Sequence, residues 1–324
     1  MKQLEIGENE AGQRLDKYLK KLLPNADSSF LYKMLRKKNI VLNGKKAQGA
    51  VHLVNGDTVT LYLSDETYEK FSADKRPPAL SAGSVPKLSV LYEDQDFLIV
   101  NKPAGMLSQK AALKDISANE CILNYLLDTG AVTPQALQTF RPSVCNRLDR
   151  NTSGILIAGK TLLGLQTMSA QLKERTVKKY YRCVVAGTLT DGQYLKGYLK
   201  KDDKKNKVTV YAGPCHNAKA EDPQIQYIET EYTPLWHCRG CTMLEVHLIT
   251  GRSHQIRAHL ASIGHPIVGD PKYGDRARNE AYRKKTGIRH QLLHAYRVEF
   301  PDGKQVTAPL PAYFSYFSEN SKAK

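Results

Sequence analysis

The chain has 324 residues, 41% of them hydrophobic, so it is long enough for two domains and too apolar to be globally disordered. Its formal net charge of +16 favours a polyanionic partner, with nucleic acid ahead of an acidic membrane surface. No apolar run reaches 18 residues, and the first residues lack the apolar core of a signal peptide. We therefore expect a cytoplasmic protein without a membrane segment.

Residues 13–63 are predicted to form a compact unit of two helices followed by small strands. In QRLDKYLKKLL the apolar residues share one helix face: Leu15, Tyr18, Leu19, Leu22 and Leu23. A second helical pattern, DSSFLYKMLRKKNI, begins at the cap-like Asp27. VLNGKKA predicts a short strand with an Asn-Gly turn, and GDTVTLYL predicts the closing strand.

This unit carries a basic face made of Lys33, Arg36, Lys37, Lys38, Lys45 and Lys46. An ordinary solvated face is the alternative, because most charge runs are no more than that. The order of the elements, however, resembles the small RNA-binding domain first described in a ribosomal small-subunit protein. The resemblance implies a domain over residues 1–64 that contacts RNA phosphates and supplies affinity more than base specificity.

Residues 65–87, DETYEKFSADKRPPALSAGSVPK, are polar and rich in proline, so we expect a linker there. A second domain over residues 88–324 follows. Helical patterns occupy 117–128 and 161–175, and strand-like runs occupy 155–158, 180–186, 206–211, 225–230, 243–249 and 294–300. Strands outnumber helices and do not alternate with them. The predicted fold is therefore α+β, with a mixed, mostly antiparallel sheet.

Six cysteines lie at positions 121, 145, 183, 215, 238 and 241, and we expect reduced thiols. HCRGC, residues 237–241, has the spacing of a metal site that Cys215 and His216 would complete. A second CxxC pair is absent, and Arg239-Gly240 favours a turn between two strands. We predict the turn and no metal.

NRLDRNTSG, residues 146–154, places Asp149 between Arg147 and Arg150, just before a turn and the strand-like ILIA. Cations beside the carboxylate would keep it ionised, so it would serve as a nucleophile or base in a cationic pocket. The alternative is an ordinary surface ion pair, and this triplet alone does not decide between them.

A second polar cluster lies in EVHLITGRSHQIRAHLASIGHPIVGDPKYGD, residues 245–275. A strand leads into Thr250-Gly251-Arg252, and a helix ending at Gly264 follows. Arg252 and Arg257 lie near the start of that helix, where its dipole adds positive potential, so they would face a phosphate or a carboxylate. The HExxH pattern of zinc hydrolases is absent.

Together with ERTVKKYYRCVVAG at 174–187, these motifs resemble the RluA-type pseudouridine synthases, and their order is the family's. The chain shows YEDQDFLIVNKPAGM at 92–106, NRLDRNTSG at 146–154 and KKYYRCVVAG at 178–187. A TGRxHQIRxH block with GxPIxGDxxYG follows at 250–274, then LLHAYRVEF at 292–300. The resemblance covers residues 88–312 and implies the pseudouridine synthase fold, an RNA substrate and no cofactor.

The resemblance assigns roles to individual positions. Asp149 matches the family's catalytic aspartate, and Arg257 matches the basic residue that pairs with it. Tyr181 matches the active-site tyrosine, six residues before Gly187, and its neighbour Tyr180 does not. Asp149, Tyr181 and Arg257 are thus the expected catalytic residues.

The RNA-contacting residues are expected on both domains. Arg147 matches an arginine associated with the extruded base, and Arg150 and Arg252 would add phosphate contacts beside the lysines of the first domain. Asn146 departs from the family, which usually has His there. An amide can form hydrogen bonds but cannot titrate, so an acid-base role at this position is in doubt.

The implied reaction detaches uracil from ribose and rejoins it through C5 after the uridine has been flipped out of the RNA. The sequence leaves open whether Asp149 attacks C1′ or C6 or removes a proton from C2′. Large-subunit ribosomal RNA is the expected target and transfer RNA the alternative. A non-catalytic RNA-binding protein and an RNA glycosylase are the rival functions. Without heptads or an exposed apolar stripe, we expect a monomer.

Overall fold

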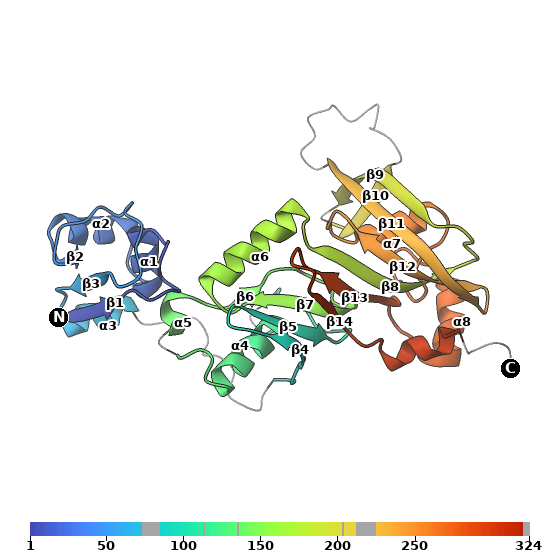
Figure 1. Cartoon of the computed structure of the whole chain (residues 1–324), viewed down its shortest axis with the longest axis horizontal. Coiled ribbons are helices and arrows are strands. Elements are labelled where there is room, and N and C mark those ends of the chain that lie inside the picture. The colour runs from blue at the N-terminus through green and yellow to red at the C-terminus, as the bar shows by residue number, and fades with distance from the viewer. Residues whose placement is uncertain (73–84, 113, 135, 203, 212–224, 320–324) are drawn as a thin grey trace.

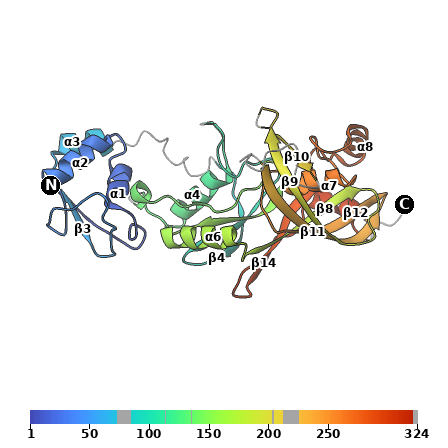
Figure 2. The same cartoon turned by 90° about the horizontal axis from the view of Figure 1, so that it is seen from above.

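The computed structural model describes residues 1–72, 85–112, 114–134, 136–202, 204–211 and 225–319. Its buried residues form two large hydrophobic clusters, one within residues 6–61 and one within residues 98–317. The first cluster belongs to a small unit at one end of an elongated molecule, and the second underlies a long sheet (Figures 1 and 2). The division between residues 64 and 88 stays a prediction, but each part has a core of its own.

The small unit contains two helices against a three-stranded antiparallel sheet of order β1-β3-β2. Its elements are β1 (Lys2–Glu5), α1 (Leu15–Leu22), α2 (Ser28–Arg36), β2 (Ile40–Leu42) and β3 (Thr58–Leu61). All five apolar residues expected on the first helical face are buried. Asp27 caps α2 by accepting a hydrogen bond from the Phe30 N–H at 2.6 Å, as its residue type favours.

The expected linker contains a helix, and this part of the prediction is wrong. Helix α3 covers Asp65–Ser72, and its Tyr68 and Phe71 pack against the core of the small unit. The Phe71 ring lies 4.4 Å from that of Phe30 on α2. A helix of eight residues with only two anchoring aromatic residues leaves too weak an apolar period to be recognised in sequence. The prolines at 77 and 78 lie outside the described residues.

The large sheet is mixed and mostly antiparallel, as expected. Its strand order is β10-β9-β11-β12-β8-β13-β7-β5-β4, with β14 beside β13 and β6 beside β7. Among the strands of the described residues, β13 and β7 run parallel and the other neighbours run antiparallel. The strands are β4 (Ser89–Glu93), β5 (Phe97–Lys102), β6 (Ser143–Val144), β7 (Ser153–Gly159), β8 (Lys178–Ala186), β9 (Gln193–Asp202), β10 (Lys207–Tyr211), β11 (Ile225–Cys238), β12 (Cys241–Leu248), β13 (Leu293–Glu299) and β14 (Gln305–Thr307).

Burial along the strands explains why some were recognised and others missed. Every residue of β7 is buried, so SGILIAG stands out as an apolar run. In β9 only Gly197 and Leu199 are buried, and the lysine-rich QYLKGYLKKD gives no strand signal. Strand β9 is therefore not recognisable in the sequence, and the same holds for β1, β14 and the polar helix α8.

Five helices and one 3-10 helix accompany the sheet in the described part of the chain, and α7 carries Arg257. They are α4 (Ala118–Asp128), α5 (Ala136–Thr139), α6 (Leu162–Glu174), α7 (Gln255–Ser262) and α8 (Arg276–Thr286), followed by the 3-10 helix η1 (Ala312–Phe317). Helix α7 contacts β10 and β11, and α6 runs beside β7 (Figure 1). None of the helices in the described parts of the chain combines the length and apolar composition needed to cross a bilayer.

The small unit touches the rest of the molecule through α5 and the start of α6. Thr139 donates a hydrogen bond to Glu10 Oε1 at 2.6 Å, and the Leu162 N–H donates to Asn9 Oδ1 at 3.2 Å. Helix α1 also contacts α5. These contacts fix the small unit at the end of the sheet away from β9 and β10.

Gly154 permits the close approach of β13 to β7. Its φ is +108°, and a Cβ at this position would lie 2.2 Å from the Ala295 carbonyl oxygen. Any other residue would push the two parallel strands apart. Because β7 follows directly after the Asp149 loop, this glycine helps to place Asp149 against β8 and β13.

Candidate active site

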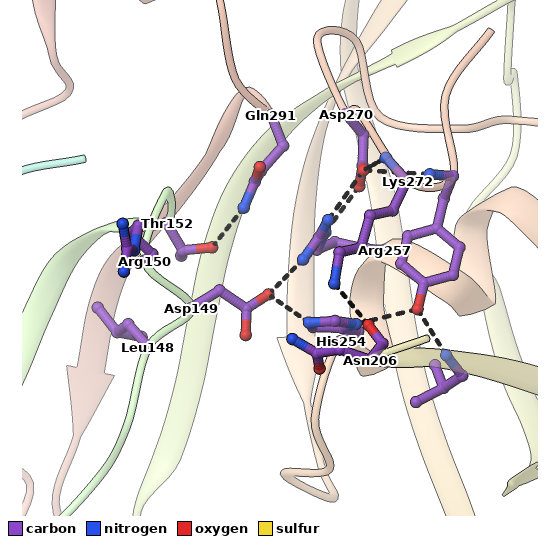
Figure 3. A network of polar contacts seen from close by, with 12 residues as sticks. Leu148, Asp149, Arg150, Thr152, Asn206, His254, Arg257, Asp270, Lys272 and Gln291 are labelled. Carbon is purple, nitrogen blue, oxygen red and sulfur yellow. Dashed lines mark hydrogen bonds and ion pairs between the residues drawn. The ribbon is translucent and has the colours of Figure 1, made fainter. Parts of the chain in front are cut away.

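Asp149 lies in the loop between β6 and β7, and the residues around it hold that loop. The Ser108 hydroxyl donates to the Leu148 carbonyl at 2.9 Å and accepts from the Leu148 N–H at 3.0 Å. The Gln291 amide donates to the Thr152 hydroxyl at 3.3 Å. Leu148 and Thr152 are buried, while the Asp149 side chain is 27% exposed. The loop backbone is thus held in place, and Figure 3 shows the Asp149 side chain pointing from it toward Arg257 and His254.

Lys102, the last residue of β5, anchors the same loop from inside. Its ammonium donates to the carbonyls of Pro103 at 3.0 Å, Met106 at 2.8 Å and Arg150 at 3.1 Å. The side chain is fully buried, and burial lowers the pKa of Lys102 to about 7, although the nearby Asp149 charge opposes the shift. Three carbonyl acceptors match the three N–H donors of a lysine ammonium. Lys102 thus ties the backbone next to Asp149 to the end of β5.

Asn146, which stands where the family usually has His, is bonded to the backbone of β7. Its Oδ1 accepts from the Ile157 N–H at 2.8 Å, and its Nδ2 donates to the Ile155 carbonyl at 3.4 Å. The two bonds use a donor and an acceptor at once, which an amide supplies. In this chain the residue at position 146 fixes the loop to β7.

Asp149 is paired with Arg257 of helix α7, the residue that the resemblance assigns as its partner. Arg257 Nη1 donates to Asp149 Oδ2 at 2.7 Å. The other side of the guanidinium donates to Asp270, Nε to Oδ2 at 2.7 Å and Nη2 to Oδ1 at 2.9 Å. Arg257 is 5% exposed and Asp270 fully buried, so the bidentate pair fixes the guanidinium before it meets Asp149 (Figure 3).

The two carboxylates also decide the charge state of Arg257. Burial alone would lower the pKa of Arg257, but the hydrogen bond and charge of Asp270, with a further contribution from Asp149, raise it above its ordinary value. Asp270 itself accepts from the N–H groups of Lys272 at 2.8 Å and Tyr273 at 3.2 Å. The site therefore contains a permanent cation held between a buried carboxylate and a partly exposed one.

His254 faces Asp149 from the residue before α7. Its Nε2 lies 4.0 Å from Asp149 Oδ2, and its Nδ1 lies 3.0 Å from the hydroxyl of Tyr273. That hydroxyl accepts from the Val208 N–H at 2.8 Å, so its own proton is free to go to His254 Nδ1. Burial lowers the pKa of His254, and Arg257 adds to this while Asp149 opposes it. We infer a neutral imidazole with its Nε2–H toward Asp149.

Tyr181 and Tyr180 lie on opposite faces of β8, as adjacent strand residues must. Tyr181 is buried, and burial together with the charge of Asp149 raises its pKa, so the phenol stays protonated. Tyr180 lies on the other face, stacked on His247 with the rings 4.8 Å apart. The structure thus brings Tyr181, and not Tyr180, into the electrostatic neighbourhood of Asp149.

The residues expected to contact RNA are exposed. Arg147 and Arg150 lie on either side of Asp149 within its loop, and Arg252 lies in the turn before α7. The side chains of Lys33, Arg36, Lys37, Lys38, Lys45 and Lys46 are all exposed on the small unit. Exposure leaves them available to a partner, and their role stays a prediction.

HCRGC forms the predicted hairpin turn. Cys238 and Cys241 are opposite each other at the end of β11 and β12, and Arg239 and Gly240 both have positive φ, as a tight hairpin requires. Cys215 and His216 lie outside the described residues. Among the described residues, no three His, Cys, Asp or Glu side chains are arranged to hold a metal ion.

Two residues that support the site were not recognised in the sequence: Asp270, which orients Arg257, and Lys102, which holds the Asp149 loop. Both belong to motifs that were recognised as a whole, GDPKYG and NKPAG, without a role for the charged residue in each. A charged residue inside an apolar run, such as Lys102 after FLIVN, was the available signal. Their contacts join segments 13 and 48 residues apart, which no local pattern displays.

Comparison with known proteins identifies a family and a fold. A family model described as RNA pseudouridylate synthase matches residues 96–262. The ribosomal large subunit pseudouridine synthase C of Vibrio cholerae is 32% identical over 323 residues, covering 96% of this chain and 93% of that protein. The synthase D of Neisseria meningitidis serogroup A is 31% identical over 316 residues, covering 93% of this chain and 76% of that protein.

Two solved structures share the fold. Human RNA pseudouridylate synthase domain containing 4 has a TM-score of 0.58 at 20% identity, covering 70% of this chain and 90% of its own. Human RNA pseudouridylate synthase domain containing 1 has a TM-score of 0.53 at 23% identity, and the match covers 72% of this chain and 86% of that one.

Proposed function

This chain belongs to the RNA pseudouridylate synthase family, and we propose that it isomerises specific uridines of large-subunit ribosomal RNA to pseudouridine. The activity follows from the family. The choice of RNA is supported by the names of the relatives that match nearly the whole chain, the ribosomal large subunit synthases C and D. Transfer RNA is the alternative substrate that the sequence left open.

The observation that carries the proposal at the level of residues is the ion pair of Asp149 with Arg257. A partly exposed carboxylate is held at 2.7 Å by a buried guanidinium that Asp270 has already oriented. This arrangement fixes Asp149 without covering it, as a group that must reach a substrate requires. In our proposal Asp149 initiates the reaction, Arg257 positions it, and Tyr181 contacts the uracil.

The proposed reaction needs no co-reactant. The N1–C1′ bond breaks, the freed uracil turns, and a C5–C1′ bond forms; C5 loses its proton and N1 gains one. Tyr181 keeps its phenolic proton because its pKa is raised, so it would act on the base by stacking before any proton transfer. Whether Asp149 attacks C1′ or C6 or removes the C2′ proton is left open.

Reaching the glycosidic bond requires that the uridine leave its stack, at a cost of a few kcal/mol. We propose that exposed cations offset this cost by phosphate contacts: Arg147, Arg150 and Arg252 beside the site, and the lysines and Arg36 of the small unit. The proposal includes an RNA-binding role for that unit. We also propose, from the sequence alone, that the protein acts as a monomer in the cytoplasm.

Tritium release tests the proposal, because C5 must lose its hydrogen. Large-subunit ribosomal RNA and transfer RNA carrying [5-³H]uridine would be incubated with the wild type, Asp149→Asn, and Asp128→Asn, an exposed carboxylate on α4. We expect release from ribosomal RNA by the wild type and Asp128→Asn, and none by Asp149→Asn, which should still bind RNA.

Other outcomes identify the rivals. Free uracil in place of pseudouridine would indicate an RNA glycosylase. Tight, salt-sensitive binding without any release would indicate a non-catalytic RNA-binding protein. If Asp149→Asn also lost the RNA or the fold, Asp149 would be a structural ion-pair partner.

A further inference from the structure

Two adjacent lysines at the start of β8 lie in different surroundings. Lys178 is exposed, whereas Lys179 is half-buried. Lys179 is two residues before Tyr181, so both side chains project from the same face of the strand. The Cα atoms of two such residues are about 6.6 Å apart. Lys179 therefore belongs to the face of the sheet on which Asp149 and α7 lie.

The Lys179 ammonium lies against the turn between β12 and α7. A Cβ on Gly251 would be 3.5 Å from Lys179 Nζ, an ordinary van der Waals distance, so the ammonium lies directly beside this glycine. The Gln255 side chain fixes this turn, because its Oε1 accepts hydrogen bonds from the Thr250 hydroxyl at 2.8 Å and from the Arg252 N–H at 3.0 Å. Lys179 and Arg252 are thus placed around one rigid turn that leads directly to Arg257.

The half-buried Lys179 differs from the fully buried Lys102 in its contacts. Lys102 donates to three carbonyl oxygens, but among the described residues no carboxylate or hydrogen-bond acceptor contacts the Lys179 ammonium. The charge that acts on it comes from another cation, Arg175. Burial and Arg175 together lower the pKa of Lys179. Lys179 is thus a half-buried cation whose charged neighbour is a second cation, Arg175, at a turn that also carries the exposed Arg252. An anion would complete this electrostatic arrangement.

We propose that Lys179 and Arg252 bind a backbone phosphate of the RNA next to the target uridine, which deepens the proposed function and rests on it. Tyr181 would contact the uracil and Lys179, one side-chain position along the same strand face, would contact the phosphate that belongs to that nucleotide. A phosphate is the anion that an RNA substrate brings to this place. The contact would hold the flipped nucleotide in register with Asp149.

The adjacent lysines give a matched pair of variants. Lys179→Ala, Lys178→Ala and Lys179→Arg would be compared with the wild type by tritium release at several KCl concentrations, with thermal unfolding as the check on folding. For Lys179→Ala we expect KM for the RNA to rise about 10-fold, the effect of one lost charged hydrogen bond. The slope of log(kcat/KM) against log[KCl] should become shallower by about 0.7 to 0.9.

Lys178→Ala should change KM less than about 2-fold. Lys179→Arg should have a KM close to that of the wild type, because the positive charge is retained. A pH series gives an independent readout. Because the pKa of Lys179 is lowered, its ammonium loses its proton at a lower pH than that of an ordinary lysine. The affinity of the wild type for RNA should therefore fall as the pH rises through this range. The affinity of Lys179→Arg should not fall there, because arginine stays charged.

Equal effects of the two alanine variants, or a fall in kcat with unchanged KM and unchanged salt slope, would overturn the phosphate assignment. Failure of the proposed function would look different, because the wild type itself would then release no tritium. In that case filter binding of the same variants to the RNA still measures the Lys179 contact.

Discussion

The cations around Asp149 and those on the small unit are held in opposite ways. Arg257 and Lys102 are buried, and each side-chain nitrogen of the two residues donates to an acceptor within the protein. Lys33, Lys37 and Lys45 are exposed on the small unit. Substituting a cation of the first kind disturbs a network, whereas substituting one of the second kind removes a single charge from a solvated face.

This difference predicts how the two regions respond to mutation. A buried charge that loses its partner costs several kcal/mol, because the remaining charge is left without water or a counter-charge. An exposed charge costs almost nothing in stability and contributes to RNA affinity in proportion to the phosphates it neutralises. Variants of buried and of exposed charged residues therefore test this contrast.

Asp270→Ala should be the most damaging change. It removes both acceptors that orient Arg257, so we expect a loss of about 3 to 5 kcal/mol in the free energy of unfolding. We also expect kcat to fall about 100-fold, because Asp149 is positioned through Arg257. Urea unfolding and tritium release measure the two effects.

A matched exposed pair provides the control for Asp270. Glu280 lies 3.0 Å from Arg283 on α8, and both are about half exposed. Glu280→Gln should cost less than about 0.5 kcal/mol and leave kcat unchanged. Asp270→Asn, which keeps the shape and the acceptor oxygen, should lie between the two. If Asp270→Ala were as mild as Glu280→Gln, Arg257 would be positioned by other contacts.

Buried histidine predicts a pH dependence of stability. His294 on β13 is fully buried beside the Ser153 hydroxyl at 2.8 Å, and burial lowers its pKa to about 4. The unfolded chain, with an ordinary histidine pKa of about 6.5, takes up a proton first as the pH falls. The free energy of unfolding should therefore fall by about 3 kcal/mol between pH 6.5 and pH 4 on account of this residue.

Urea unfolding at pH 7.5 and pH 5 of the wild type and His294→Gln checks this. The variant should be less stable at pH 7.5 but lose less on acidification, while His52→Gln, at an exposed histidine, should behave as the wild type. His259 is also buried, and its pKa is likewise lowered to about 4. It should therefore maintain part of the pH dependence of stability in the wild type and in His294→Gln. An unchanged slope in His294→Gln would show that His294 does not titrate with folding.

Lys37→Ala should have the smallest effect. Lys37 is exposed at the end of α2, so stability should change by less than about 0.5 kcal/mol. RNA affinity should fall a few-fold, and the slope of log affinity against log salt should become shallower by about one. Lys173→Ala, at an exposed position on α6, is the control and should leave the slope unchanged. If both variants behaved alike, the small unit would carry a solvated face and no RNA contact.

Most of the secondary structure was predictable, because in strongly periodic segments the spacing of the apolar residues indicates which side chains are buried. The apolar run of β7 and the helical faces of α1 and α2 are examples, and all lie where expected. Helix α3 and strand β9 were missed for one reason. Each is anchored by two residues while its remaining side chains are polar, so its structure depends on the neighbour it packs against.

The sequence by itself determined the family and the order of the motifs, and it predicted Asp149, Tyr181 and Arg257 as the catalytic residues, because each lies in a long local pattern. Only the tertiary structure decided that Arg257 is shared with Asp270, and that the amide of Asn146 binds β7. It also decided that Lys179 lies against a rigid turn, where none of the residues described in the structure pairs with its ammonium. The physical reason is distance along the chain: Asp149 and Arg257 are 108 residues apart, and their contact exists only once strand register and loop closure bring them together.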